Sequence, residues 1–239
     1  MSVMNKQEIN GQTNELAHLT LGDIGSQGDT LAYYDGEMVN VFGGIPGEEV
    51  VCRIVRYRRK RKRKISAVVT KVLKPSPHRV APPCPYFGEC TGCQWQHIEY
   101  SHQLELKRVV IERELKRHSE LGNAAVSSTM PSPNRAGYRN HARFTVRRNG
   151  SLGYINRYTR RFVKIDHCML MSSWINEALG MLQGQCAETS QLSVRHGINT
   201  SEWLIQPTLN NERIHLKSGQ AYYREELLGK KFRIASPSF

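Results

Sequence analysis

Three cysteines within ten residues carry the clearest chemistry of this sequence. Residues 84–93 read Cys-Pro-Tyr-Phe-Gly-Glu-Cys-Thr-Gly-Cys, which spaces the thiols as CxxxxxCxxC. Thiolates at this spacing, in a loop that contains proline and glycine, can turn onto one metal centre. Three ligands leave one position open, and a further cysteine follows a strand-like run at residue 168. The sequence therefore predicts a metal centre whose ligands are Cys84, Cys90, Cys93 and Cys168.

Disulfide bonds are a weaker interpretation of these cysteines. The N-terminus is polar and lacks the apolar segment of a secretory signal, so the expected compartment is the reducing cytoplasm, where disulfides are rare. Spacing alone does not separate zinc from an iron–sulfur cluster, since both accept four thiolates. His78, His97 and His167 also keep a mixed Cys/His zinc site open. Cys52 and Cys186 have no such neighbours and are expected to pack in the core.

The composition is that of a basic globular chain. Charged residues make up 23% and hydrophobic residues 39% of the 239 positions, which is typical of a folded domain. The formal net charge of +13 indicates an anionic partner, nucleic acid before membrane. No apolar run approaches the ~20 residues that span a bilayer. No basic amphipathic helix with a wide apolar face stands out either, so no membrane partner is expected.

The N-terminal part is predicted to be a small β-barrel. Residues 16–74 read as five short strands between glycine turns, at residues 18–24, 30–34, 37–41, 49–57 and 64–73. Five short strands in under sixty residues predict an OB-like closed barrel, a shape that often binds oligonucleotides. The polar residues 1–15 are expected to be flexible, and the proline-rich residues 75–83 are expected to form a stiff linker.

A dense run of positive charge lies inside the predicted barrel. Without its nine cations the net charge falls from +13 to +4. Apolar residues flank the run on both sides, which predicts the tip of a long hairpin. Clustered cations can follow a phosphate backbone, whereas the alternative is a solvated face or a sorting signal. The predicted nucleic-acid-binding cations are Arg53, Arg56, Arg58, Arg59, Lys60, Arg61, Lys62, Arg63 and Lys64.

Residues 84–239 are predicted to form an α+β domain with an antiparallel sheet and two helices, so that the whole chain is α+β and β-rich. One helix is expected from Ser101, as N-cap, to about His118, and a second begins at a serine cap, Ser172 or Ser173. The strands are expected at residues 138–147, 152–155, 161–165, 191–196, 202–206, 213–216 and 231–235, with a hairpin turn at residues 149–150.

The first of these strands has two unlike faces. Alternation places Ala142, Phe144 and Val146 on an apolar face, and basic side chains on the other. Arg139 and Arg143 on the basic face are predicted to contact nucleic acid. The alternative is an exposed sheet face whose charges pair with acids elsewhere.

A search for catalytic motifs finds none. The sequence has no GxGxxG after a strand, no phosphate-binding P-loop, no HExxH and no GxSxG. We therefore predict no catalytic residue, and the residues by themselves indicate a metal-bearing nucleic-acid-binding protein without naming a reaction.

Taken together, the motifs resemble those of the RNA uracil-5-methyltransferases, in the iron–sulfur branch that acts on uridine in 23S ribosomal RNA. The resemblance rests on the cysteine loop followed by Trp95-Gln96-His97, on Tyr138-Arg139-Asn140, and on the position of Cys168. It implies that residues 16–74 are a TRAM domain, that the four cysteines hold a [4Fe-4S] cluster, and that the partner is RNA, in particular ribosomal RNA.

The resemblance also implies a part that this sequence does not show. Members of the family carry a C-terminal domain that binds S-adenosylmethionine, with a cysteine nucleophile and a carboxylate base. The sequence ends where that domain is expected, and Cys186 does not match the catalytic motif. The expectation is therefore a truncated portion that is not catalytic by itself, or one completed by a separate catalytic chain. S-adenosylmethionine is expected only if the missing domain is present.

A rival interpretation is a stand-alone RNA-binding module with a structural four-cysteine zinc site. A third is a redox-sensing RNA binder in which loss of the cluster changes the affinity for RNA. The metal distinguishes the methyltransferase portion from the zinc-binding module, because zinc is colourless and iron–sulfur clusters absorb visible light.

Overall fold

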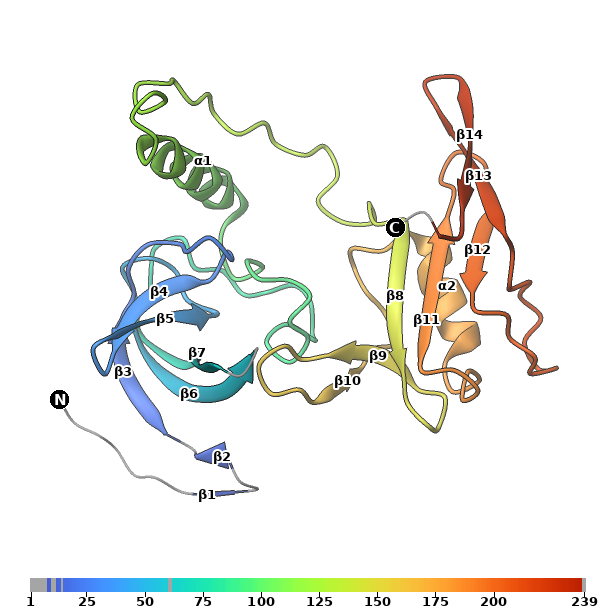
Figure 1. The fold of residues 1–239 in the computed structure, drawn as a ribbon, viewed down its shortest axis with the longest axis horizontal. Coiled ribbons are helices and arrows are strands. Elements are labelled where there is room, and N and C mark those ends of the chain that lie inside the picture. Colours follow the sequence, from blue (N-terminus) through green and yellow to red (C-terminus); the bar gives the residue numbers. More distant parts are fainter. Residues whose placement is uncertain (1–7, 10–11, 14, 60–61, 238–239) are drawn as a thin grey trace. The chain divides into compact units, whose positions relative to one another are not determined.

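The structure is a computed structural model that describes residues 8–9, 12–13, 15–59 and 62–237. The chain forms two compact units. The N-terminal unit contains the described residues up to Pro131 together with Arg157–Thr159, and the C-terminal unit contains Ser132–Asn156 and the residues from Arg160 onward. Strands predominate and the described residues contain two helices (Figure 1). The prediction of a β-rich α+β fold is therefore confirmed.

A five-stranded sheet organises the N-terminal unit, in the order β3-β6-β7-β5-β4. Neighbouring strands are antiparallel except β5 and β7, which are parallel. Within the segment predicted to be flexible, the described residues form two short paired strands, β1 and β2. The bounds are β1 Glu8–Ile9, β2 Gln12–Thr13, β3 Leu16–Thr20, β4 Thr30–Tyr34, β5 Glu37–Phe42, β6 Glu49–Arg59 and β7 Lys62–Lys74.

The inward side chains of this sheet make its core. Strand alternation buries Val39 and Val41 on β5 and Val50, Cys52 and Ile54 on β6. The chain that follows β3 then bonds to β4, because the Gly22 N–H donates to the Leu31 carbonyl at 2.8 Å. These contacts curl the sheet so that its edges approach each other, while the OB-like class of the sheet stays a prediction.

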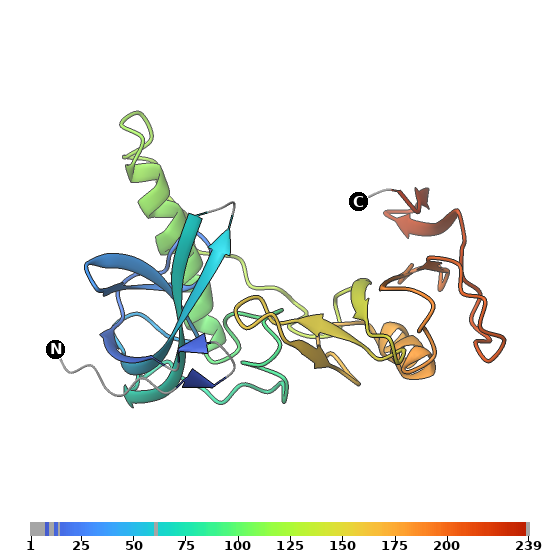
Figure 2. The same cartoon turned by 60° about the horizontal axis from the view of Figure 1, so that its bottom comes forward.

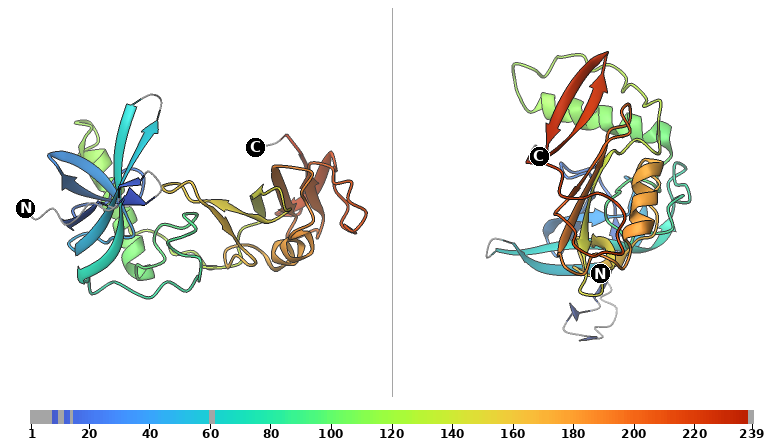
Figure 3. Two further views of the ribbon diagram at one scale, coloured as in Figure 1. Left: turned by 90° about the horizontal axis from the view of Figure 1, so that it is seen from below. Right: turned by 90° about the vertical axis from the view of Figure 1, so that its right-hand side faces the viewer.

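The predicted long hairpin is confirmed. Strands β6 and β7 pair antiparallel as far as Arg59 opposite Lys62, and they extend beyond the neighbouring strands (Figures 2 and 3). Both strands are longer than predicted, since cross-strand backbone hydrogen bonds continue into the basic run. Lys60 and Arg61 lie outside the described residues.

The first helix, α1 (Tyr100–Lys116), belongs to the N-terminal unit. The predicted N-cap at Ser101 is wrong, because the helix begins one residue earlier and Glu99 is its cap. Near its start, the Gln103 side chain donates to the carbonyls of Trp95 and Ile98 at 3.0 and 2.9 Å, which ties the first turn to the residues just before the helix. One face of α1 packs through Leu106.

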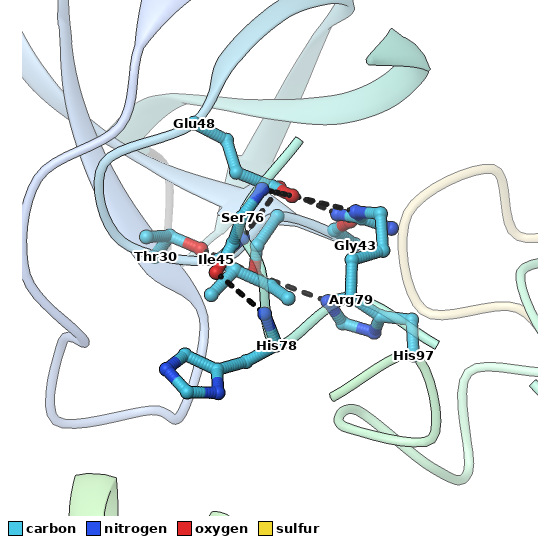
Figure 4. Close-up of polar contacts among 9 residues, drawn as sticks. Thr30, Gly43, Ile45, Glu48, Ser76, His78, Arg79 and His97 are labelled. Atoms are coloured by element: carbon cyan, nitrogen blue, oxygen red, sulfur yellow. Dashed lines mark hydrogen bonds and ion pairs between the residues drawn. The ribbon is translucent and has the colours of Figure 1, made fainter. Parts of the chain in front are cut away.

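A buried carboxylate joins the sheet to the segment that follows it (Figure 4). Glu48 is 0% exposed and accepts Arg79 Nε and Nη2, each at 2.6 Å. It also accepts the backbone N–H groups of Ile45 and Ser76 at 2.9 and 3.0 Å. Arg79 Nη2 further donates to the Gly43 carbonyl at 2.8 Å. Residues 76–79 are thereby held on the loop between β5 and β6.

The boundary between the two compact units does not lie at the predicted linker. Residues 75–83 lie inside the N-terminal unit, where Arg79 binds Glu48, and the chain first leaves that unit after Pro131. Four prolines between residues 75 and 83 favour extended backbone, but they do not prevent side chains from docking.

A second five-stranded sheet organises the C-terminal unit, in the order β10-β9-β8-β11-β12 with all neighbours antiparallel. Helix α2 (Ser173–Leu182) lies on one face (Figure 3) and buries Ile175, Leu179 and Leu182. The Ser172 hydroxyl accepts the Ile175 N–H, which confirms the predicted cap. The strands are β8 His141–Val146, β9 Leu152–Ile155, β10 Phe162–Lys164, β11 Gln191–His196 and β12 Trp203–Gln206.

The last hairpin was predicted only in part. Strand β14 (Lys230–Ala235) was expected, whereas its partner β13 (Tyr222–Leu227) was not. Leu228 and Gly229 between them have φ of +50° and +70°, the backbone of a two-residue type I′ turn. Leucine is rare in such turns, so the hairpin leaves little sign in the local residue pattern.

The strand predicted at residues 213–216 is wrong. Asn211 Oδ1 accepts the Arg213 N–H at 3.1 Å, and the Asn211 carbonyl accepts the Ile214 N–H at 2.9 Å. A local turn therefore uses backbone groups that a strand would need.

We expect Glu48→Gln to destabilise the N-terminal unit by about 3–5 kcal/mol, because it removes the charge that compensates Arg79 in a buried pair. Burial would raise the pKa of Glu48, but the Arg79 side chain and two backbone N–H groups outweigh it and hold the pKa below its ordinary value of 4.5. A carboxyl with a lowered pKa stabilises the fold above the pKa of the unfolded chain. This stabilisation is lost as the pH falls below about 4.5. The free energy of unfolding of Glu48→Gln should therefore decrease less over this pH range than that of the unaltered protein.

Urea unfolding at pH 7 and at lower pH would measure both effects. The matched control is Glu49→Gln, whose side chain is 51% exposed and lies 3.6 Å from Lys74, and which should cost less than about 1 kcal/mol. Equal destabilisation of the two variants would contradict the role assigned to Glu48.

Candidate functional site

The cysteine loop, residues 84–93, folds as a chain of turns in the N-terminal unit. The Phe87 N–H donates to the Cys84 carbonyl at 3.1 Å, and the Cys90 N–H donates to the Tyr86 carbonyl at 2.7 Å. Gly88 between them has a φ of +92°, which a glycine adopts without strain. The turns return the chain on itself, so three thiols that are each partly exposed share one short loop.

The residues that follow the last cysteine of this loop attach it to the N-terminal sheet unit. Gln94 donates to the Gln27 carbonyl at 2.7 Å, and Trp95 Nε1 donates to the Gly28 carbonyl at 2.6 Å. Gln96 turns back and accepts the Cys84 N–H at 3.2 Å. Four consecutive side chains, counting His97, thus hold the loop by hydrogen bonds.

His97 acts as a buried anchor. Its Nε2 lies 3.1 Å from the Gly44 carbonyl, so Nε2 carries the proton and donates it. The ring is 2% exposed, and burial lowers the pKa of His97 to about 4. The imidazole is therefore neutral at pH 7 and binds the loop between β5 and β6 (Figure 4).

The four predicted metal ligands are divided between the units. Cys84, Cys90 and Cys93 belong to the N-terminal unit and Cys168 belongs to the C-terminal unit. No group of three or more His, Cys, Asp or Glu side chains that could hold a metal ion occurs in the described part of the chain. The four-cysteine centre therefore stays a prediction.

The donor chemistry nevertheless fits a thiolate-bound metal. All six cysteines lie in described segments and none forms a disulfide. Soft thiolates suit iron–sulfur clusters and zinc, and binding of the metal supplies the free energy that draws such ligands together. The predicted packing role of Cys52 and Cys186 is confirmed, since both are 0% exposed.

One carboxylate gathers three segments next to the cysteine loop. Asp29 is 4% exposed and accepts Gln94 Nε2 at 3.0 Å and the Tyr158 hydroxyl at 2.6 Å. Arg157 also donates to Asp29, and its backbone N–H donates to Thr91 Oγ1 at 2.9 Å. Tyr158 packs against Phe42 with ring centroids 5.4 Å apart. Arg157–Thr159 are thereby built into the N-terminal unit.

The predicted RNA-binding cations of β6 and β7 differ in their surroundings. Arg56 is paired with the buried Glu15 at 2.9 Å, which raises the pKa of Arg56 and uses part of its charge inside the fold. Lys64 is exposed and Arg53 is partly exposed. The backbone places Arg58, Arg59, Lys62 and Arg63 at the end of the hairpin, and their side chains lie outside the described part.

Two exposed aromatic side chains of the N-terminal sheet, Tyr33 and Tyr57, were missed by the sequence analysis. Tyr33 on β4 pairs with Met38 on β5, and Tyr57 on β6 pairs with Lys64 on β7. Tyr33 is 71% and Tyr57 is 39% exposed. Exposed aromatic rings beside cations are typical of surfaces that bind single-stranded nucleic acid.

The predicted RNA contacts on β8 are only partly available. Arg143 is exposed, but its guanidinium donates to Gln191 Oε1 at 2.6 Å. Arg139 is partly buried, and its backbone bonds to Leu170 and Ser172. Arg147, which the strand pattern places on the predicted basic face, and Arg148, which was not considered, are both exposed just beyond β8. Two adjacent cations before an Asn-Gly turn were the signal in the sequence.

Comparison with known proteins gives one consistent result. No family model matches the chain. It is 31% identical over 180 residues to an uncharacterized RNA methyltransferase of Bacillus cereus, which covers 74% of this chain and 39% of that protein. It is 34% identical over 169 residues to one of Geobacter sulfurreducens, with 69% and 34% covered. The chain thus spans about two fifths, or less, of the length of these relatives.

A solved structure has a similar fold. The crystal structure of Pyrococcus abyssi tRNA (uracil-54, C5)-methyltransferase in complex with S-adenosyl-L-homocysteine matches with a TM-score of 0.60 at 22% identity. The match covers 92% of this chain and 60% of that one. The relatives are named RNA methyltransferases, which confirms the predicted resemblance at that level. Neither described helix is long and apolar enough to cross a bilayer.

The burial of the six thiols predicts two classes of reactivity. Burial raises the pKa of Cys52 to about 12 and that of Cys186 to about 11, so neither forms a thiolate at pH 8. Iodoacetamide should modify Cys84, Cys90, Cys93 and Cys168 in the folded metal-free protein, and the buried pair only after unfolding. Peptide mass spectrometry would measure this. Native-state modification of Cys52 would contradict the packing.

Proposed function

We propose that these 239 residues are the RNA-binding, cluster-bearing portion of an S-adenosylmethionine-dependent RNA (uracil-5-)-methyltransferase that acts on 23S ribosomal RNA. The observation that carries the proposal is the cysteine loop, docked through Gln94–His97 on a sheet with a basic hairpin, in a chain similar to RNA methyltransferases. The proposed location is the cytoplasm, where thiols stay reduced.

The RNA-binding role is supported by charge and its placement. The chain carries 34 Lys and Arg against 21 Asp and Glu, and the densest cations lie on the β6–β7 hairpin. A hairpin carries these cations on a paired backbone, which costs less ordering on binding than a disordered tail would. Tyr33 and Tyr57 supply rings on which unpaired bases can stack.

The cysteine residues are proposed to hold a [4Fe-4S] cluster. Cys84, Cys90 and Cys93 would supply three thiolates and Cys168 the fourth, and the cluster would act as a covalent cross-link between two distant segments. A structural zinc ion on the same ligands is the alternative. The proposal assigns no catalytic role to a residue of this chain, and methyl transfer is proposed for the whole protein only.

Anaerobic purification should give a brown protein with about four irons and four sulfides per chain. Iron, sulfide and zinc analysis with a visible spectrum would measure this. Cys93→Ser should lose the colour, whereas the matched control Cys186→Ser should keep it. If the analysis finds one zinc and no iron per chain, the cysteines hold a structural zinc ion and the cluster proposal is wrong.

Replacing Lys60, Arg61, Lys62 and Arg63 by serine should weaken RNA binding and lower its dependence on salt. For each phosphate that the variant no longer binds, the slope of log K against log salt should decrease in magnitude by about 0.7–0.9. Fluorescence anisotropy with a ribosomal RNA fragment and with transfer RNA would measure both quantities. The control replaces Arg213, Lys217, Lys230 and Lys231, four exposed cations of the C-terminal unit, by serine. If the affinity for RNA decreases equally in the two variants, the hairpin has no specific role in RNA binding.

A further inference from the structure

The turn between β8 and β9 borders a hollow of about 660 Å³ in the C-terminal unit. The turn is rigid: the Gly150 N–H donates to the Arg147 carbonyl at 2.8 Å, and the Arg147 N–H donates to the Ser151 carbonyl at 2.9 Å. Asn149 Oδ1 accepts the Ser151 N–H at 3.1 Å. The lining residues are Val146, Arg147, Arg148, Asn149, Ser151 and Phe162.

The two arginines of this hollow bring positive charge that the fold does not neutralise. Neither Arg147 nor Arg148 forms an ion pair with a described residue, and both are exposed. Other arginines of the chain are paired: Arg108 lies 2.5 Å from Glu105, and Arg224 lies 2.8 Å from Glu202. The hollow therefore offers two guanidinium groups to an anion, and each can bind a phosphate through two parallel hydrogen bonds.

An aromatic ring forms part of the same wall. Phe162 on β10 is partly exposed, and the Arg147 guanidinium carbon lies 5.5 Å from its ring centroid. Gly153 on β9 makes room for this ring, because a Cβ there would meet Phe162 Cζ at 2.8 Å and the Val163 carbonyl oxygen at 2.1 Å. A glycine at this position thus leaves room for the tip of the Phe162 ring.

Cations, a ring and small hydrogen-bonding groups together match the parts of a nucleotide. The arginines suit the phosphate, the ring and the guanidinium plane suit a base, and the hydroxyl of Ser151 and amide of Asn149 suit a sugar. The ring already contacts the Arg147 guanidinium, and its exposed part can contact a base. A base inside a duplex could not reach the ring, so the ligand is an unpaired nucleotide.

We propose that this hollow binds one unpaired nucleotide of an RNA strand. The inference rests on the proposed function, and it adds to it a specific subsite in the C-terminal unit, distinct from the β6–β7 hairpin of the N-terminal unit. Phosphate contacts by Arg147 and Arg148 position the strand, and the ring of Phe162 favours nucleotides whose base is free to stack.

The test uses the full chain and a fluorescent single-stranded RNA in anisotropy titrations at several salt concentrations. Arg147→Gln with Arg148→Gln should weaken binding at least tenfold and lower the salt slope by roughly 0.7 for each phosphate no longer bound. Phe162→Leu should weaken binding about fivefold or more, as removal of one stacked base does, with the salt slope unchanged. Binding of a fully paired duplex should not respond to Phe162→Leu.

The matched control is Arg213→Gln with Lys217→Gln, which removes the same charge from exposed positions of the same unit. Circular dichroism checks that each variant is folded. If the Arg147 and Arg148 variant behaves like this control while the hairpin variant loses affinity, the hollow is not a subsite and the proposed function stands. If the unaltered chain binds no RNA, both the nucleotide subsite and the proposed RNA-binding function are wrong. Stronger competition by polyglutamate than by RNA would assign the hollow to an acidic peptide instead.

Discussion

A carboxylate without solvent contact constrains much of the N-terminal unit. Glu48 is charged and fully buried, which is costly unless hydrogen-bond donors surround it. Its donors come from two segments, the loop of residues 43–48 and residues 76–79. The chain leaving β7 must therefore return to the loop between β5 and β6. His97 binds Gly44 in the same loop, so the beginning and the end of the cysteine-bearing segment are fixed to one place on the sheet.

The 34 Lys and Arg side chains are not all available to RNA. Arg79, Arg56 and Arg157 each serve a buried carboxylate, and their guanidinium groups act as internal structural parts. By contrast, Lys64 on β7 and Arg147 and Arg148 after β8 are exposed and form no ion pair with a described residue. The available charge is therefore concentrated on paired strands and turns, where the backbone already holds the side chains apart. An ordered array of this kind binds a polyanion with less loss of conformational entropy than a flexible basic segment.

Features encoded within a few residues could be predicted from the sequence, and features that depend on distant partners could not. The long basic hairpin, the Asn-Gly turn and the Ser172 cap each follow from local pattern. The start of α1 was missed although its partners are near, because no simple pattern shows that Gln103 bonds to Trp95 and Ile98, eight and five residues before it. The role of Asp29 could not be predicted from the local sequence, since its partners are residues 94, 157 and 158. Thiol spacing identified the cysteine loop, but no local pattern indicated that four side chains after it would anchor it.

The assignment of Arg157–Thr159 to the N-terminal unit has a consequence for how the protein can be divided. The chain passes between the units after Pro131, after Asn156 and after Thr159. A single cut after Pro131 would leave the N-terminal fragment without Tyr158, and so without a ring that packs on Phe42 and a hydroxyl that binds Asp29. The two halves are thus not interchangeable modules. Gene fusion or exchange of one half between related proteins would have to carry this three-residue insert along with the half to which it belongs.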